Sequence, residues 1–317
     1  MSSTGELDDG LDTGRLDTRS EAGPPAVGPP DGPGTTVEPV RVPQSSLVTE
    51  ARAATVVWQR EMIRLGKDRA RILSSLAQPL LFLFVLGSGL GSLLGRGVPG
   101  SVRFDTFLFP GVLAISVLFT AAFSGISMVW DREFGFLREM LVAPVSTASI
   151  LLGKAVGGAS TATLQSVVLL ALAGLVGVPY DPLMLLTLLG LLFLMAFMIT
   201  SLGLLLAARV RQVQSAMPLV QLIITPLMFL SGALFPLGNL PTWLTVLTHV
   251  NPMTYAVEPL RHVVFARLAV GPADRARFDP GIVWGSWPVP TGVQILVTVA
   301  FSVVLLGAAV ARFRRTE

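Results

Sequence analysis

The segment 131–146 combines ionisable and apolar side chains in a pattern that suits contact with another protein. Its charged residues are Asp131, Arg132, Glu133, Arg138 and Glu139. In a helix, Phe134, Leu137 and Leu141 would form one apolar ridge, and mixed charges around such a ridge are typical of a short helix that docks in a partner's groove. A helix lying on a membrane is the alternative, but it would favour cations. Pro144 would end this helix, and Ser146, or the threonine after it, could cap the next one.

Residues for catalysis or metal binding do not gather in any recognisable motif. The chain has no cysteine, and its two histidines, His249 and His262, are too far apart in sequence to form a ligand pair on one helix. It also lacks a phosphate-binding G-x-x-x-x-G-K-[ST] loop, a G-x-S-x-G elbow and an H-E-x-x-H pair. We therefore expect neither enzymatic activity nor a metal site in this chain.

Long apolar stretches flank the segment 131–146 and must position it. Hydrophobic residues make up 52% of the chain and charged ones 14%, whereas a soluble domain carries about a quarter charged residues. A helix that crosses a bilayer needs about 20 apolar residues. The sequence therefore predicts an all-α polytopic membrane protein with a six-span domain at 72–317. Its expected transmembrane helices are at about 72–95, 106–130, 150–178, 182–208, 216–236 and 291–311.

Two segments precede the predicted spans. Residues 1–45 are acidic and rich in proline and glycine, so we expect a disordered cytoplasmic tail. Residues 46–71 predict an amphipathic helix whose apolar face includes Trp58 and whose cations include Arg60 and Arg64. We expect this helix to lie in the inner membrane interface. A simple extension of the first span is the alternative.

The distribution of cations predicts the orientation. Lysines and arginines concentrate before the first span, in the loops after the second and fourth spans, and at the C-terminus. Because cytoplasmic loops are enriched in these residues, both termini are predicted to be cytoplasmic. We expect a multi-pass protein of the cell membrane that contacts lipid and no nucleic acid.

Polar residues within the predicted spans are few, and none in the middle of a span is ionisable. Proton-coupled carriers usually keep an ionisable relay there, so we expect energy to come from a cytoplasmic partner. Sodium coupling through backbone carbonyls stays open. A pathway of apolar side chains with occasional amides suits a hydrophobic or amphipathic passenger. Its candidate residues are Phe119, Phe123, Met128, Gln221, Thr225 and Phe229.

Small residues recur at four-residue intervals in the first two spans. Gly87, Gly91 and Gly95 share one face of the first span, and Ala121 and Gly125 share one face of the second. Such faces allow two helices to approach closely. Because glycine is frequent in membrane helices generally, a specific packing role and ordinary composition are about equally good explanations.

The segment 237–261 is broken by prolines and is too long to be a simple connection. It predicts short re-entrant or extracellular helices between the fifth and sixth spans. Asn251 can cap a helix that starts at Pro252. Glu258 and Arg261 would lie one turn apart on that helix, as a structural ion pair or as a gate.

Several motifs, in this order along the chain, resemble those of one known family. They are Phe109-Pro110-Gly111, Asp131-Arg132-Glu133-x-Gly135 running to Pro144-Val145-Ser146, Leu230 to Pro236, Pro241-x-Trp243-Leu244, and Asn251 to Glu258 with Arg261. Over about residues 50–315 the chain resembles the permeases of type-2 ATP-binding-cassette (ABC) exporters, and within them the daunorubicin-resistance branch of drug and lipid permeases. The acidic tail is longer than the family pattern.

The resemblance implies a permease subunit that exports a hydrophobic drug, antibiotic or lipid. It implies a homodimer or heterodimer of permeases with two separate cytoplasmic ATPase subunits, which would bind ATP and Mg. It also implies functional segments. The contact with the ATPase would be made by Asp131, Arg132, Glu133, Phe134, Gly135, Leu137, Arg138, Glu139 and Pro144. The connecting helix would carry Trp58, Arg60 and Arg64, and the outer gate would hold Ser231, Gly232, Phe235, Pro236, Asn251, Pro252, Tyr255, Glu258 and Arg261.

Two other classes of transporter stay open at this point. An exporter of polysaccharide or another glycolipid is the nearest alternative, and an aromatic-lined groove would favour it. An ion-coupled secondary carrier is a further alternative. A membrane enzyme or receptor would need a polar cluster in or near the spans, and the sequence offers only Glu258, Arg261 and His262 for one.

Overall fold

A computed structural model describes residues 47–67, 69–94, 103–135, 145–210, 212–238 and 240–316 of the chain. These residues belong to one compact unit, Pro43–Glu317. The predicted tail at 1–45 lies outside the described residues. So do Leu137, Arg138, Glu139 and Pro144 of the predicted docking segment.

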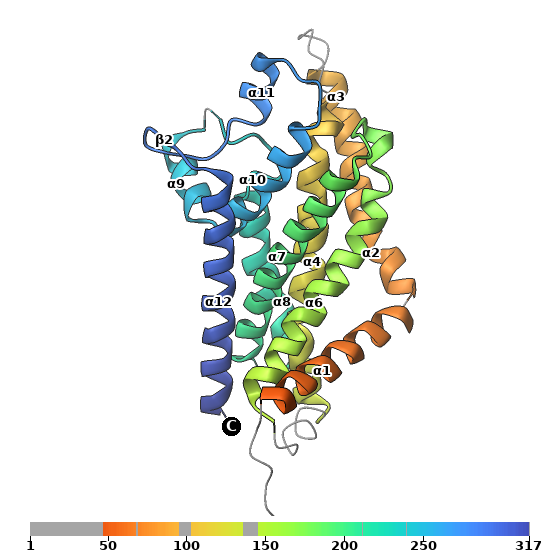
Figure 1. The fold of residues 1–317 in the computed structure, drawn as a ribbon, viewed down its shortest axis with the longest axis vertical. Helices are drawn as coiled ribbons and strands as arrows, with labels where there is room; N and C mark the ends of the chain where they lie inside the picture. Colours follow the sequence, from red (N-terminus) through yellow and green to blue (C-terminus); the bar gives the residue numbers. More distant parts are fainter. Residues whose placement is uncertain are drawn as a thin grey trace, which may run out of the picture. The chain divides into compact units, whose positions relative to one another are not determined.

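Helices make up most of the described residues, and the long ones run side by side (Figure 1). In chain order the elements are α1 (Leu47–Lys67), α2 (Arg69–Leu81), η1 (Phe82–Leu86), α3 (Gly87–Leu94), α4 (Phe104–Glu133), α6 (Thr147–Leu170), η2 (Ala173–Val176), α7 (Pro182–Ala207), α8 (Val213–Phe229), α9 (Thr242–Val250), α10 (Pro252–Phe265), α11 (Pro272–Phe278), β1 (Val283–Trp284), β2 (Trp287–Pro288) and α12 (Thr291–Thr316). The two short strands form an antiparallel hairpin that pairs Trp284 with Trp287.

Among the residues that the structure describes, three helices are long and apolar enough to cross a membrane: α4, α7 and α12. Shorter apolar helices occur at Leu76–Gly89 and at α8. The chain is therefore a mostly helical membrane protein, as predicted. The number of six spans stays a prediction, because α6, although 24 residues long, is not apolar enough to count as a candidate span, and the two other apolar helices are short.

The first predicted span is interrupted by a π-helical turn. Helix α2 leads into η1, a π-helix of five residues, and then into α3. Pro79 lies in α2 just before that turn. Because proline cannot donate a backbone hydrogen bond, the regular ladder breaks near it, and a π-turn is a common local solution.

Two predicted spans end earlier than expected. The fifth was predicted to run to about residue 236, but α8 stops at Phe229 and turns follow. Gly232 has a φ of +73°, a left-handed conformation that ends helices and favours glycine. The third was predicted to reach residue 178, but α6 stops at Leu170, and a 3-10 turn ends at Gly177, whose φ is +77°. Apolar composition continued past both ends, so hydropathy alone overestimated the helix lengths.

Helix α4 lies at the centre of the bundle. It packs against α7, α6, α8 and α10, and most of its length is buried inside the protein. Its crossing with α7 depends on small residues. A Cβ atom at Gly125 would lie 2.5 Å from the carbonyl oxygen of Thr200 and 2.8 Å from the Cα of Gly203. The predicted small-residue face of the second span is therefore a packing surface, which lets two backbones come into contact.

Helices α9 to α11 and the β-hairpin gather at one end of the bundle, the upper end in Figure 1. Helices α9 and α10 are the short helices predicted between the fifth and sixth spans. The side chain of Asn251 accepts a hydrogen bond from Met253 N and so caps α10, whose first residue is Pro252, as predicted.

Candidate functional site

Four ionisable residues meet where α1 crosses the lower part of α6 in Figure 1, near the end of α4. We call Arg60, Glu61, Asp131 and Lys154 the charge cluster. Lys154 Nζ lies 3.0 Å from Glu61 Oε1 and also forms an ion pair with Asp131. Arg60 Nη2 donates to Asp131 Oδ1 at 3.2 Å. The cluster therefore joins three helices by charge-assisted hydrogen bonds.

The charge cluster is buried, except for Arg60. The side chain of Lys154 is 2% exposed, that of Asp131 4% and that of Glu61 8%, whereas that of Arg60 is 43% exposed. Two acids and two bases balance in charge, and Ser127 Oγ lies 3.1 Å from Lys154 Nζ as a further partner. Removing one of the buried members would leave a buried charge without its partner, which typically costs about 3–5 kcal/mol.

Glycines on α6 allow α1 to come close enough for these contacts. A Cβ atom at Gly157 would lie 2.9 Å from the Cβ of Glu61, and one at Gly153 would lie 2.5 Å from the carbonyl oxygen of Ala54. Contacts that short force a shift of the helix. Glycine at both positions therefore sets the separation between the two helices and brings Glu61 within reach of Lys154.

The predicted connecting helix is fixed to the bundle along its length. Trp58 Nε1 donates to Ser160 Oγ at 3.0 Å, and the Arg64 guanidinium lies over the ring of Trp130, with its Cζ 5.9 Å from the ring centroid. These contacts direct the polar ends of both side chains toward the protein. The position of this helix in the inner membrane interface stays a prediction.

The beginning of α1 is attached to the beginning of α6. Glu50 Oε2 accepts from the backbone N of Ser146 at 3.1 Å and from its Oγ at 2.6 Å, and Ser149 Oγ is a further partner. The hydrogen bonds from Ser146 and Ser149 hold the pKa of the Glu50 carboxyl below its ordinary value of 4.5. Ser146 also caps α6, as predicted, because its side chain accepts from Ser149 N.

The described part of the predicted docking segment is engaged within the protein. Besides Asp131, Arg132 donates to the carbonyl oxygens of Ala207 and Val210, each at 3.2 Å, and stacks on Phe313. Glu133 Oε2 accepts from Val213 N at 2.8 Å, at the start of α8.

The end of that described part has a different environment. Phe134 is 70% exposed, and Gly135 has a φ of +82°. Gly135 turns the chain away from α4, because only glycine adopts that conformation readily. Contact of this segment with an ATPase stays a prediction.

A second buried ion pair lies near the other end of α4. Arg261 Nη1 donates to Glu258 Oε2 at 2.9 Å, and both side chains are at most 2% exposed. Arg261 also donates to the carbonyl oxygen of Gly232, and its Cζ lies 4.8 Å from the ring centroid of Phe107. One guanidinium therefore joins α10, the turn after α8 and the first turns of α4.

The other predicted gate residues lie at the start of α10, within it, or in the turn that follows α8. Asn251 Nδ2 donates to Leu227 O at 2.9 Å, and Ser231 Oγ donates to Met228 O at 2.7 Å. Tyr255 OH donates to His249 O at 2.8 Å and accepts from Trp284 Nε1 at 3.1 Å. Phe235 and Pro236 are half-buried in the turn that follows α8. The structure thus holds these segments together, and a role in gating stays a prediction.

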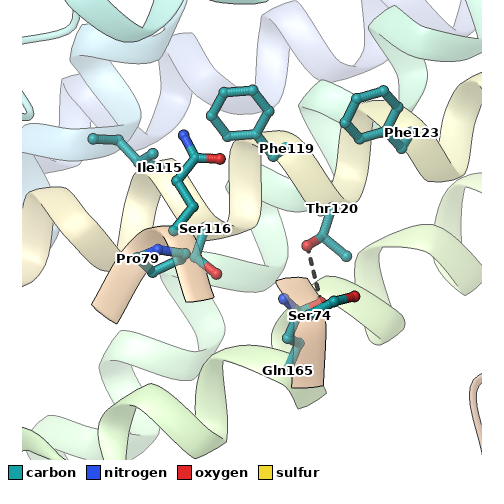
Figure 2. Close-up of a pocket in the computed structure, with 9 residues that line it drawn as sticks. Ser74, Pro79, Ile115, Ser116, Phe119, Thr120, Phe123 and Gln165 are labelled. Atoms are coloured by element: carbon teal, nitrogen blue, oxygen red, sulfur yellow. Dashed lines mark hydrogen bonds between the residues drawn. The ribbon is translucent and has the colours of Figure 1, made fainter. Parts of the chain in front are cut away.

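The residues predicted to line a pathway fall in three places. Phe119 and Phe123 line a cavity of about 170 Å³ between α2, α4 and α6 (Figure 2). Met128 is buried in the core. Gln221 and Thr225 are joined by a 3.0 Å hydrogen bond on an exposed face of α8, where Phe229 is 50% exposed. In this chain they do not form one continuous surface.

Sequence reasoning missed the charge cluster. Glu61 lies three residues after Trp58 on the apolar face of α1, and Lys154 lies in α6 among glycines and alanines. An acid on an otherwise apolar helical face and a lysine inside an apolar helix each need a buried partner. Because Glu61 and Lys154 each need a buried partner of opposite charge, the sequence could have indicated that they pair with each other. Within the described residues no group of three or more His, Asp or Glu side chains could hold a metal ion.

Comparisons with known proteins place most of the chain in one group. Residues 52–265 match the sequence model of the ABC-2 type transporter family. Nodulation protein J of Rhizobium leguminosarum bv. trifolii is 31% identical over 217 residues, which cover 68% of this chain and 82% of that protein. The transport permease ycf38 of Cyanophora paradoxa is 30% identical over 208 residues, which cover 65% of this chain and 72% of that protein.

Proposed function

This chain belongs to the ABC-2 type transporter family, and from that premise we propose that it is the permease subunit of an ATP-driven exporter. Its passenger would be a hydrophobic drug, antibiotic or lipid taken from the cytoplasm or the inner leaflet. The proposal of a daunorubicin-resistance type of passenger rests on the motifs in the sequence. The permease function itself follows from the family.

The charge cluster is the observation that supports a mechanical role most directly. Asp131 lies in the last turn of α4 and is the first residue of the segment predicted to dock on an ATPase. A force on that segment would reach Asp131 first. The buried pairs with Lys154 and Arg60 would then transmit it to α6 and α1 together, because separating the charges would be costly.

Such a connection suits alternating access. Two ATPase subunits that close on ATP would pull the docking segments of two permease copies, and each copy would move α1, α4 and α6 as one body. Helix α8 would move with them, because Glu133 accepts a hydrogen bond from the backbone of Val213 in the first turn of α8. At the opposite end, the Arg261 pair would keep the turn after α8 attached to α10 until the pathway opens.

The partners of this assembly are part of the proposal. They are two cytoplasmic ATPase subunits, a second permease copy and membrane lipid, with both termini of this chain in the cytoplasm and the protein in the cell membrane. ATP and Mg would be bound by the ATPase.

Phe134 offers a direct test, because it is the exposed apolar residue at the start of the docking segment. Phe134→Asp should abolish co-purification of the ATPase and ATP-dependent efflux, at unchanged abundance in the membrane. Val48→Asp changes an equally exposed apolar residue of α1 and should leave both unchanged. Normal efflux by Phe134→Asp would count heavily against the proposal.

Export of a polysaccharide or another glycolipid is the second candidate. The cavity between α2, α4 and α6 favours it, because two phenylalanine rings and several amides and hydroxyls line that cavity. An ion-coupled carrier has no such supporting observation. Transport that persists without any ATPase and stops with an ionophore would speak for it.

A further inference from the structure

A short segment at the upper end of the bundle in Figure 1 is fastened to α10 by polar contacts. We call residues 272–281, which comprise α11 and the loop after it, the strap. Arg275 Nη2 donates to the carbonyl oxygen of Phe265 at 3.0 Å. Near the other end of the strap, Asp279 Oδ2 lies 3.1 Å from His262 Nδ1. The two contacts tie the strap to the second half of α10.

The strap also packs on the beginning of α4. The ring of Phe278 lies next to that of Phe107, with centroids 5.3 Å apart. Phe107 is fully buried, and its ring is the one that the Arg261 guanidinium contacts from α10. Release of the strap would therefore open the surroundings of Arg261, which holds the turn after α8.

His262 and Asp279 differ in their access to water. The side chain of His262 is 58% exposed, whereas that of Asp279 is 4% exposed. Burial raises the pKa of the Asp279 carboxyl above its ordinary value of 3.8, although the charges of His262 and two nearby arginines oppose that rise. A proton from water can therefore reach the imidazole directly, and the buried carboxylate depends on a positive partner.

The pair lies within a small group of charges. The other charged residues that face it are Glu258 and Arg261 from α10 and Arg275 from α11. Arg261 is engaged with Glu258, and Arg275 is engaged with a backbone carbonyl. Within the described residues, His262 is therefore the cation that forms a hydrogen bond with the Asp279 carboxylate.

The charge of His262 decides how strong this contact is. Histidine is the side chain whose charge ordinarily changes between about pH 5 and 8. A protonated imidazole donates from both nitrogens, so its Nδ1 gives Asp279 a charge-assisted hydrogen bond. A neutral imidazole donates from one nitrogen alone and carries no charge, so the contact is weaker.

Proton binding and closure of the strap support each other at both residues. The imidazolium gains its carboxylate partner in the closed strap, and the burial of Asp279 there favours the protonated carboxyl. The closed strap therefore binds protons more tightly than an open one, in which both side chains would be in water. By linkage, a falling pH favours the closed strap and a rising pH favours the open one.

We propose that His262 and Asp279 form a proton-sensitive latch, which holds the strap closed over the beginning of α4 in acid and releases it as histidine loses its charge. In the predicted orientation the strap faces the outside of the cell, so the latch would respond to the external medium. Closing would keep Arg261 and the turn after α8 in place. The latch depends on neither a passenger nor an ATPase and so goes beyond the proposed function.

Thiol labelling of the full chain in lipid nanodiscs tests the latch. The chain has no cysteine, so Phe278→Cys places a single thiol where the strap meets α4, and Ala276→Cys places one on the exposed side of α11. A bulky maleimide reacts with the first thiol when the strap is open. Because any exposed thiol becomes more reactive as it ionises, the labelling rate of Phe278→Cys is divided by that of Ala276→Cys at the same pH.

This rate ratio should rise about fivefold from about pH 5.5 to about pH 8, the change expected when a hydrogen bond to a charged group becomes a neutral one. His262→Lys keeps a positive charge at both pH values and should keep the ratio low at both. His262→Gln is neutral and should give a high ratio at both. A ratio that is the same at the two pH values when His262 is present would overturn the proposal.

Two further variants separate the latch from a general effect of pH. Asp279→Asn removes the carboxylate and should abolish the rise in the ratio, because the imidazolium then has no anionic partner in the strap. His249→Gln replaces the only other histidine of the chain, which lies in α9 and is not among the charges that face Asp279. It should leave the fivefold rise intact.

Persistence of the rise in Asp279→Asn, or its loss in His249→Gln, would refute the assignment of the latch to this pair. Because the measurement contains neither an ATPase nor a passenger, such a result would leave the proposed function intact.

Discussion

Replacing Lys154 by methionine should destabilise the protein strongly, because it leaves the charge cluster with one acid too many. The Lys154 side chain is 2% exposed, and its Nζ pairs with both Glu61 and Asp131. Removing one partner of a buried ion pair costs about 3–5 kcal/mol. A loss of about 1 kcal/mol lowers the midpoint temperature of thermal unfolding by about 2–4 °C in a chain of 150–250 residues. Lys154→Met should therefore lower this midpoint by roughly 6 °C or more.

A second substitution distinguishes charge from packing. Glu61→Gln in the Lys154→Met background restores charge balance and keeps the pair between Arg60 and Asp131, whose atoms are 3.2 Å apart. Replacing a buried pair by neutral groups of similar volume is often close to neutral in stability. The double variant should therefore regain half or more of the loss, which is a coupling that only groups in contact show.

The assay is the fraction of monodisperse protein that remains after heating in detergent, read by size-exclusion chromatography. Lys67→Met is the matched control, because Lys67 is exposed in the last turn of α1 and should have a midpoint within about 1 °C of the unmodified chain. If Lys154→Met behaves like Lys67→Met, or if the double variant is less stable than the single one, the reasoning about the charge cluster is wrong.

Three further outcomes can be checked in the same assay. Gly111→Ala should cost about 1–3 kcal/mol or more, because its Cβ would collide with a backbone carbonyl, whereas Gly190→Ala has open space and should be neutral. Arg261→Met should lower the free energy of unfolding by about 3–5 kcal/mol. Adding Glu258→Gln, which removes the charge of the carboxylate partner, should restore part of this loss. The depressed pKa of Glu50 contributes stability that is present above pH 4.5 and is lost as the pH falls through its lower folded value. Ser146→Ala should reduce that acid dependence, and an unchanged pH profile would contradict the assignment.

Local patterns were enough to predict the features that depend on neighbouring residues. The fourth predicted span, 182–208, is α7 at Pro182–Ala207, because Asp181 and Pro182 form a clear start and the apolar run is uninterrupted. The cap at Asn251 and the ion pair of Glu258 with Arg261 also follow from spacing within one helix.

Features that depend on distant residues could not be predicted in the same way. Glu61 and Lys154 are 93 positions apart, and neither helix indicates which residue of the other it meets. The end of α8 depends on the left-handed Gly232, whose carbonyl Arg261 binds from α10. Likewise, the cavity between α2, α4 and α6 needs five polar residues from three helices, each of which looks like an isolated polar residue in its own span.

The most direct test of the proposed function is transport by the purified chain in vesicles, with and without its ATPase. The account predicts that ion gradients alone drive no uphill movement of any passenger, and that movement begins when both the ATPase and ATP are present. Accumulation against a gradient by this chain alone, abolished by an ionophore, would contradict it.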